Sequence, residues 1–568
     1  MTLITGGELL ARALANEGVR FVFGLPCPEI DPFLVALPAH RIRFVPVRHE
    51  AAAVHMAEGL YKTTGQVAVV LGNPGPGTSN LIPGLVTARH EGVPVIAITS
   101  QHRAGVVYPA TPATFQGQDQ IDLLKPAVKW NAPVFDWTRI PELVRMAFRE
   151  AFAGRPGPVH LEVPGPTLYA EGEPATARVF THESGRAGPP QASEAQLEAA
   201  AQLLASANRP VIFAGTGVDR AWANAALIAL AEQLGCPVIP SLAGRSVMPH
   251  EHPLCFLSQS PSADELRRRA DVMLVVGSRV GNLDVPFDKY WGDPTGCRVV
   301  HVDVDPRHIG VSRPVALGIV ADARTTLEGL AVKLRDRQIA SLGRTDVAEQ
   351  RVAYGAWVQA IRERIAAWAG PGIHPAHACA VVGEVFGRNA IYTVDGGNTS
   401  LWASLALPST RPASYHSILE FGMLGTGIPS AIGAKLGAPD REVVCVTGDG
   451  AAGFNVMELQ SAARDGIKVT VIVMAEGEWT MEIPNEMQRY GQTFGTTMGE
   501  VRWDLVAQGL GCHGECVQSL ADLPAALERA RHDDRPALVC VRTSKEANLS
   551  VPDDVVARFF EVYFGPAA

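Results

Sequence analysis

The stretch "VVCVTGDGAAGFNVMELQSAARDGIKVTVIVMAEGEW", residues 443–479, joins two apolar, β-branched runs through a helical segment. Short runs of this kind, separated by a helix, are typical of neighbouring strands in a parallel sheet. The first run ends at Gly448-Asp449-Gly450 and the second at Glu476. Because open parallel sheets bind ligands at the carboxyl ends of their strands, Asp449 and Glu476 are predicted to share a binding edge.

The residue types at this edge indicate a divalent metal beside a phosphate. Carboxylate and carbonyl oxygens are the ligands that Mg²⁺ prefers. Glycines on both sides of Asp449 let the backbone approach a phosphate closely, and the helix that follows offers free N–H groups to an anion. The segment therefore predicts a magnesium-dependent diphosphate site.

Similar apolar runs alternate with helical segments along the 568-residue chain, among them "VAVVLG", "VMLVVGS" and "AIYTVDGGN". This alternation predicts the α/β class, with doubly wound parallel sheets. Stretches rich in Pro, Gly and polar residues at 169–196 and 370–375 are typical of domain boundaries. We expect three domains, at residues 1–170, 190–345 and 370–550.

Composition excludes several classes of protein. The formal charge is −9 and no basic run interleaves with aromatic residues, so a nucleic-acid partner is not expected. No apolar run is long enough for a membrane span, and the N-terminus lacks the pattern of a signal peptide. The nine cysteines have no framework spacing, which fits reduced thiols and a cytoplasmic location. Cys512, His513 and Cys516 are an alternative metal set, disfavoured because structural zinc normally takes four ligands.

Six motifs resemble, in family order, those of thiamine-diphosphate-dependent enzymes, and most closely those of the acetohydroxyacid (acetolactate) synthase large subunit. One is the Gly-Asp-Gly segment described above. The others are "RHEAAAVHMAEGLYKTTG" (48–65), "GNPGPGTSNLIPGLVTA" (72–88), "ATFQGQDQIDLL" (113–124), "RVVHVDVDPRHIG" (298–310) and "FGMLGTGIPSAIGAKLGAPD" (421–440). The fourth of these is similar to the last strand of that family's middle domain.

The resemblance implies a pyrimidine-binding domain, a middle Rossmann-like domain and a diphosphate-binding domain. It assigns the metal to Asp449, Glu476 and the backbone carbonyl of Glu478. It assigns cofactor binding to Gly397, Asn398, Thr399, Gly422, Leu424, Gly448, Gly450 and Ala451. In that family Leu424 would wedge under the cofactor and hold it bent, and the carbonyl of Gly422 would accept a hydrogen bond from its amino group.

Glu50 lies at the head of a small-residue helix that Gly65 ends. In the family this carboxyl hydrogen-bonds the pyrimidine N1′ and favours the imino tautomer that removes the thiazolium C2 proton. Glu50 is therefore expected to relay a proton, and apolar surroundings would help by raising its pKa. The alternative is that Glu50 only stabilises the helix, through the favourable interaction of its negative charge with the N-terminal end of the helix dipole.

The chain departs from the family pattern at several positions. Glu476 replaces the usual Asn ligand, which adds negative charge beside a diphosphate. Leu283, in "GSRVGNLDVPFD", stands where an arginine holds the carboxylate of the second oxo acid, which places acetolactate synthesis in doubt. The segment "FLSQSPSADEL" (256–266) replaces a motif near the flavin, so FAD or another nucleotide in the middle domain is left open.

The predicted substrate pocket differs as well. Cys27 and Pro28 replace a Gly-Gly pair, and Glu482 is expected to add a carboxyl near them. Phe115 and Gln116 keep the family's catalytic Phe-Gln element, whereas the paired histidines of simple decarboxylases are absent there. The candidates for a general acid are three histidines that the sequence does not rank, namely His49, His55 and His102.

These observations favour a thiamine-diphosphate-dependent carboligase or decarboxylase that acts on a 2-oxo acid. One alternative is a lyase that cleaves a 2-hydroxy carbonyl compound or its CoA thioester. Another is a non-catalytic paralogue that binds a nucleotide or a partner subunit. The family places its cofactor between two subunits, so we expect at least a homodimer, with a homotetramer as the larger assembly.

Overall fold

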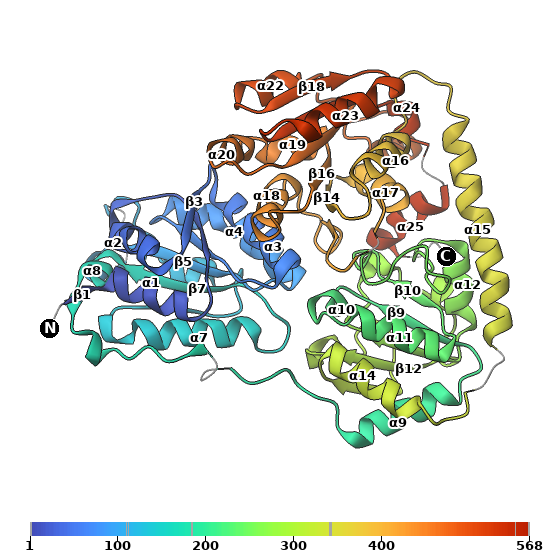
Figure 1. The fold of residues 1–568 in the computed structure, drawn as a ribbon, viewed down its shortest axis with the longest axis horizontal. Coiled ribbons are helices and arrows are strands. Elements are labelled where there is room, and N and C mark those ends of the chain that lie inside the picture. Colours follow the sequence, from blue (N-terminus) through green and yellow to red (C-terminus); the bar gives the residue numbers. More distant parts are fainter. Residues whose placement is uncertain are drawn as a thin grey trace.

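The computed structural model describes residues 3–109, 111, 113–182, 186–339, 343–409, 411–550 and 553–565. Three large sheets follow one another along the chain, and all of their strand pairs are parallel (Figure 1). Buried apolar residues of the middle sheet fall into two clusters, one for each face. The predicted α/β class with doubly wound parallel sheets is confirmed.

The first sheet has the strand order β3-β2-β4-β5-β7-β6. Its strands are β2 (Phe21–Gly24), β3 (Arg43–Pro46), β4 (Val69–Gly72), β5 (Ile96–Gln101), β6 (Asn131–Pro133) and β7 (Val159–Pro164). Its main helices are α1 (Gly6–Asn16), α3 (Glu50–Thr64), α4 (Pro76–Glu91) and α7 (Ile140–Phe152). A short antiparallel pair, β1 (Ile4–Thr5) with β8 (Glu171–Gly172), joins the two ends of this region.

The middle sheet has the order β10-β9-β11-β12-β13. Its strands are β9 (Pro210–Ala214), β10 (Val238–Pro240), β11 (Val272–Val276), β12 (Arg298–Asp303) and β13 (Leu317–Val320). Its main helices are α9 (Glu194–Ala205), α11 (Asn224–Leu234), α12 (Pro261–Arg269) and α14 (Ala323–Leu334). The "RVVHVDVD" strand was wrongly predicted to be the last, because the short β13 pairs along its outer side.

The third sheet has the order β15-β14-β16-β17-β19-β18. Its strands are β14 (Ile391–Asp395), β15 (Tyr415–Ser417), β16 (Val443–Gly448), β17 (Thr470–Ala475), β18 (His513–Val517) and β19 (Ala537–Arg542). Its main helices are α16 (Pro375–Phe386), α17 (Gly397–Ala406), α18 (Gly427–Gly437), α22 (Trp503–Gly509) and α23 (Leu523–His532). Two helices of seven residues, α19 (Asp449–Asn455) and α20 (Glu458–Arg464), follow β16.

Two helices tie the middle and C-terminal domains together. The long helix α15 (Gly343–Ala366) runs from one to the other along the side of the molecule (Figure 1). Helix α25 (Asp553–Phe564) follows the last strand and returns to the middle domain, where Arg558 pairs with Asp264 and Glu561 accepts from Lys289. Among the residues described above, no helix is long and apolar enough to cross a membrane.

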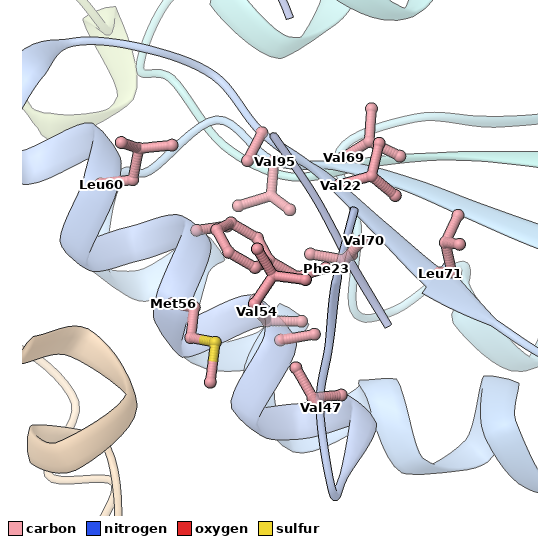
Figure 2. Packing of buried hydrophobic residues seen from close by; sticks show 14 of the residues in the cluster. Val22, Phe23, Val47, Val54, Met56, Leu60, Val69, Val70, Leu71 and Val95 are labelled. Atoms are coloured by element: carbon pink, nitrogen blue, oxygen red, sulfur yellow. The ribbon is translucent and has the colours of Figure 1, made fainter. Parts of the chain in front are cut away.

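Helix α3 begins at Glu50 and ends before Gly65, as predicted. His49 caps it by accepting the Ala51 N–H through Nδ1 at 3.1 Å. Its apolar side chains, such as Val54 and Leu60, lie beside buried strand residues including Phe23 and Val70 (Figure 2).

The other side of α3 packs on α18 of the C-terminal domain. A Cβ on Gly59 would lie 1.9 Å from the Ser430 carbonyl oxygen, and one on Gly433 would lie 1.8 Å from that of Met56. The two backbones therefore meet at facing glycines. This close approach explains why α3 is rich in small residues and carries few charges.

Candidate functional site

The carboxyl ends of β14, β16 and β17 lie next to one another in the third sheet, and we call this region the C-terminal edge. It consists of Gly396–Thr399, Gly448–Ala451 and Glu476–Glu478. Glycines make it possible for these segments to lie close together. A Cβ on Gly450 would be 2.4 Å from the Trp479 ring, and one on Gly448 would be 3.1 Å from the Thr399 hydroxyl. The ten-residue helix α17 starts here and directs its first N–H groups at the edge.

Asp449 is held in place by backbone N–H groups of its neighbours. Its Oδ2 accepts from the N–H of Glu476 at 2.9 Å and of Gly477 at 2.7 Å, and its Oδ1 accepts from Gly450 at 2.8 Å. Burial raises the pKa of Asp449, and these three bonds oppose the rise by stabilising the ionised form. Since each carboxylate oxygen has two lone pairs, Oδ1 keeps one position for a cation.

Glu476 uses only one of its two oxygens within the chain. Oε1 accepts from the Thr480 hydroxyl at 2.7 Å and from the Asn548 amide. Oε2 is buried and has no hydrogen-bond partner among the described residues. Burial raises the pKa of Glu476 to about 7, and the nearby charges of Asp449 and Glu478 contribute to the rise.

Asn548 and Thr480 form a buried polar group behind Glu476. Asn548 donates to the Thr480 hydroxyl at 2.8 Å and accepts from the Trp402 indole N–H at 2.8 Å. The indole fixes which end of the Asn548 side chain is the donor, so the amide N–H groups face Glu476. These bonds orient the Glu476 carboxylate so that Oε1 is hydrogen-bonded and Oε2 has no hydrogen-bond partner among the described residues.

This donor set suits a hard cation such as Mg²⁺. Within the described chain, no three His, Cys, Asp or Glu side chains gather into a metal cluster. The predicted set needs only two carboxylates, the spare oxygens of Asp449 and Glu476, together with a backbone carbonyl. The Glu478 side chain pairs with Lys545 at 3.0 Å, which is compatible with Glu478 contributing its carbonyl instead. The alternative Cys512, His513 and Cys516 set is not among such clusters.

The loop 422–427 is fastened to the same edge by Asp395, the last residue of β14. Asp395 Oδ2 accepts from the N–H of Gly425 at 2.9 Å and of Gly427 at 2.8 Å. Burial raises the pKa of Asp395 to about 6. Gly422 is exposed and has a φ of +80°, and Leu424 is half-buried. Both predicted cofactor residues therefore lie on a tethered and accessible loop.

Glu50 occupies a separate place, at the carboxyl edge of the first sheet. Its carboxylate is buried and accepts from the Asn80 amide at 3.0 Å, while a Cβ on Gly77 would lie 3.0 Å from its Oε1. Both neighbours belong to α4 of the same domain. No hydrogen bond or ion pair between described residues joins Glu50 to the C-terminal edge.

The Phe115-Gln116 element lies on an exposed loop near Glu50. Phe115 is 79% exposed, and Gln116 has a φ of +55° with its carbonyl against Gly75. His102 donates from Nε2 to the Phe115 carbonyl at 2.8 Å, which positions the loop. Of the other two candidate acids, His49 caps α3 and His55 is buried against Glu58 at 3.0 Å.

Beneath this loop lies a buried polar network that sequence reasoning missed. Gln120 accepts from the Gly75 N–H at 3.0 Å and from the Thr78 hydroxyl at 2.6 Å, and donates to Glu162 at 3.0 Å. Tyr108 also donates to Glu162. Burial raises the pKa of Glu162 while these donors oppose the rise. The network links the glycine loop at 72–77 to the strand ends below it.

Cys27 and Pro28 follow β2 on the same side of the first domain. The Cys27 thiol lies 3.4 Å from the Ser100 hydroxyl. Burial raises the pKa of Cys27 to about 11, so the thiol stays protonated at neutral pH. These two residues and Glu482 come from different domains, and no hydrogen bond or ion pair between described residues joins them.

Glu482 lines a cavity of about 510 Å³, which we call the tail cavity. It lies between the first turn of α17, the segment 481–485, the residues around Asn548 and the aromatic side chains of α25. The predicted third domain ends at residue 550, so the aromatic residues of α25 that line the cavity were not predicted. The aromatic run "RFFEVYF" (558–564) is the sequence feature that could have indicated these lining residues.

A second cavity, of about 710 Å³, opens at the carboxyl ends of the middle strands, and we call it the middle cleft. Its lining includes Arg155, Arg220 and Arg279. Arg155 and Arg220 donate to the backbone carbonyls of His90 at 2.6 Å and Glu91 at 2.9 Å, whereas Arg279 pairs with Glu420 at 3.0 Å. Leu283 lies in the short turn after Arg279 and brings no cation.

Three stretches of the chain match domains of a known protein family. The chain matches the thiamine pyrophosphate enzyme N-terminal TPP binding domain at residues 4–123, the central domain at 197–330 and the C-terminal TPP binding domain at 395–541. The chain belongs to the thiamine pyrophosphate enzyme family.

Curated relatives cover almost the whole chain. It is 30% identical to the acetolactate synthase large subunit of Corynebacterium glutamicum, over 96% of this chain and 88% of that protein. It is 29% identical to a probable acetolactate synthase large subunit of Methanococcus aeolicus, over 96% and 93%. It is also 28% identical to the sulfoacetaldehyde acetyltransferase of Alcaligenes xylosoxydans, over 93% and 90%. The predicted resemblance to acetolactate synthase-like proteins is confirmed.

Proposed function

We propose that the protein is a thiamine-diphosphate-dependent carboligase. It takes a 2-oxo acid as donor, removes the carboxyl group as CO₂ and joins the remaining acyl unit to an acceptor carbonyl. The observation that carries this proposal is the Asp449–Glu476 pair at the C-terminal edge, in a chain similar to acetolactate synthase large subunits over nearly its full length.

The C-terminal edge offers the groups that such a cofactor requires. Asp449, Glu476 and the Glu478 carbonyl would hold Mg²⁺, and the backbone at Gly397–Thr399 and Gly448–Ala451 would bind the diphosphate. Thiamine diphosphate bound there would supply a nucleophilic carbon and a place for the electron pair of the broken carboxyl bond. Leu424 would support the cofactor from below, and the Gly422 carbonyl would bind its amino group.

Glu50 would hold and exchange a proton at the pyrimidine ring nitrogen of the cofactor. Its burial beside α4 keeps water from competing for that hydrogen bond, and Asn80 orients the carboxylate. Gln116 and Phe115 would face the reacting carbon from the neighbouring loop. The Asn80 bond leaves one oxygen of Glu50 available for this exchange.

The working form would be at least a homodimer. Among the described residues of one chain, no hydrogen bond or ion pair joins Glu50 to the C-terminal edge, and large apolar side chains are exposed near both. Phe115 is 79% exposed, and Phe454 on α19 is 59% exposed. A second copy that lays its first domain over the C-terminal edge would cover these residues and complete the site.

The middle cleft would bind a phosphate-bearing nucleotide. Arg155 and Arg220 bond only to neutral carbonyls among the described groups, so their charges remain available to phosphate oxygens. FAD and ADP both carry such phosphates. A nucleotide there would contribute to stability, because the cleft lies between the first and middle domains.

The direct test is to measure CO₂ release and the coupled product from the full chain with a series of 2-oxo acids. We expect turnover that depends on both thiamine diphosphate and Mg²⁺. A chain that binds no thiamine diphosphate in calorimetric titration would contradict the proposal. Cleavage of 2-hydroxyacyl-CoA without any use of 2-oxo acids would also contradict it. No feature of the described structure favours that lyase or a non-catalytic paralogue.

A further inference from the structure

The tail cavity opens beside the C-terminal edge. Asn398, in the first turn of α17, belongs to both. Met481 lines the cavity, and its Cβ would lie 3.1 Å from a Cβ on Gly397. Asn548 also lines it and donates to Glu476. A molecule in this cavity would therefore lie next to the groups proposed to hold the cofactor.

Six of the eleven residues that line the cavity carry purely apolar side chains, namely Leu401, Met481, Pro484, Leu549, Phe560 and Phe564. The polar groups are the amides of three asparagines, the hydroxyl of Tyr563 and the carboxylate of Glu482. At about 510 Å³ the cavity has the size of an ordinary small-molecule site, and it exceeds what a methyl group or a two-carbon unit would fill.

Neither Arg nor Lys is among the residues that line the cavity. The cations on the surrounding elements are engaged elsewhere: Lys545 pairs with Glu478 at 3.0 Å, and Arg558 pairs with Asp264. Arg489 is exposed and lies over the Phe564 ring, 5.0 Å from its centroid. In the stretch 549–568, Arg558 is the one basic residue.

An anionic group in this cavity would find no cation among the lining residues, and Glu482 would repel it. An uncharged carbonyl compound avoids both costs. Its carbonyl oxygen can accept from an asparagine amide, while an apolar or aromatic substituent contacts the phenylalanine rings.

We propose that the tail cavity binds the acceptor, and that this acceptor is an uncharged aldehyde or ketone with a bulky apolar substituent. This inference rests on the proposed function. The donor loses its carboxyl carbon as CO₂, and the electron pair of the broken bond forms the new bond to the acceptor carbonyl carbon. The acceptor oxygen takes up one proton and becomes a hydroxyl, so the product is an uncharged 2-hydroxy ketone.

The test compares a neutral aromatic aldehyde with an anionic one, using the full chain with thiamine diphosphate, Mg²⁺ and whichever 2-oxo acid releases CO₂. Benzaldehyde is the neutral probe and 4-formylbenzoate the anionic one. We expect kcat/KM for benzaldehyde to be at least about tenfold higher, since the added carboxylate would meet Glu482 and no cation in the lining. Equal values, or a preference for 4-formylbenzoate, would overturn the inference.

Two variants locate the effect. Glu482→Gln should reduce the ratio of kcat/KM between benzaldehyde and 4-formylbenzoate, because it removes the repelling charge. The control Glu328→Gln, at an exposed position on α14, should leave this ratio unchanged. Phe564→Ala should raise the KM for benzaldehyde by about tenfold through lost apolar contact. An unchanged KM would place the acceptor outside this cavity. CO₂ release is measured separately, so loss of the donor step would contradict the proposed function rather than the acceptor assignment.

Discussion

The C-terminal edge and the middle cleft are built alike but present different charged groups to a ligand. Both lie at the carboxyl ends of parallel strands, where loops and helix starts gather. The C-terminal edge presents two carboxylates, Asp449 and Glu476, so a diphosphate can bind there only together with a cation. The middle cleft presents arginines that can contact phosphate oxygens directly. The shared architecture provides a place for a ligand, and the side chains at the strand ends decide which ligand it is.

The two regions also differ in how they are encoded. Most of the C-terminal edge comes from one continuous segment, 443–479, with a second contribution at 396–399. The middle cleft combines Arg155 of the first domain with Arg220 and Arg279 of the middle domain. A site that depends on how domains pack leaves no local pattern in the sequence.

The largest expected effect concerns Glu50, which would take part in the reaction of a cofactor bound at the C-terminal edge and would have no role in the middle cleft. Glu50→Gln should slow exchange of the cofactor C2 proton by about 10² to 10⁴-fold, because an amide cannot relay a proton. Hydrogen–deuterium exchange followed by NMR measures this rate. The exposed Glu171→Gln serves as control, and wild-type exchange in Glu50→Gln would remove the carboxyl from the mechanism.

The next effect concerns the charge of the C-terminal edge. Glu476→Ala should weaken binding of thiamine diphosphate and Mg²⁺ by about 10 to 100-fold, since a metal ligand is lost. Glu476→Asn should retain binding, because its amide oxygen can still coordinate and one negative charge near the diphosphate is gone. Calorimetric titration with metal present measures both. Unaltered affinity in Glu476→Ala would exclude the ligand role.

A smaller effect is expected in the middle cleft. Arg220→Ala should weaken ADP binding by about tenfold and reduce its dependence on salt, because one phosphate contact is lost. Arg298→Ala removes an exposed arginine at the opposite end of the same sheet and is the matched control. Fluorescence titration at two salt concentrations measures the change. Equal loss in both variants would show that the cleft does not select phosphate.

The smallest effect separates two buried aspartates, Asp284 in the middle domain and Asp395 beside the C-terminal edge. Burial raises the pKa of Asp284 to about 7 in the middle domain, and Oδ1 accepts from the Leu242 N–H at 3.1 Å. Between about pH 4 and 7 the folded group stays protonated while the unfolded one is ionised, so stability falls as pH rises through this window. Asp284→Asn lacks this penalty and should raise Tm at pH 8 by about 2 to 4 °C, with less gain at pH 4.

Asp395→Asn provides the contrast. Both Asp395 oxygens accept backbone N–H groups, from Gly396 at 2.8 Å and from Gly425 and Gly427, so an amide would set a donor against a donor. This variant should lose stability by about 1 to 3 kcal/mol. Thermal melts of both variants at pH 4 and 8 check the pair. A gain in Tm for Asp395→Asn would contradict the role of Asp395 as a loop anchor.

The sequence predicted the features that are local. The period of the apolar runs indicated parallel sheets, and the glycines at 448 and 450 indicated the turn that positions Asp449. It also predicted the α3 helix from Glu50 to Gly65. The domain limits at 170, 190, 345, 370 and 550 stay predictions, since helices α15 and α25 each contact more than one domain.

The sequence did not predict features that depend on tertiary packing. Asn548 lies 72 residues from Glu476 and orients it through a bond that no spacing reveals. The edge strand β13, Leu-Gly-Ile-Val, is only four residues long and contains a glycine, so it was not recognised as a strand. The facing glycines of α3 and α18 were visible as small residues, but only the structure shows that the two helices use them to meet each other.

The central claim is that Glu50 and the C-terminal edge act together although one chain leaves them unconnected. The direct measurement mixes two inactive variants, Glu50→Gln and Asp449→Ala, after dissociation and reassembly. If each site combines Glu50 of one subunit with the edge of the other, mixed dimers hold one intact site. About a quarter of wild-type activity should then return, because half of the dimers are mixed and each has one working site of two. If both groups act within one chain, no intact site can form, and the absence of recovery would contradict the account.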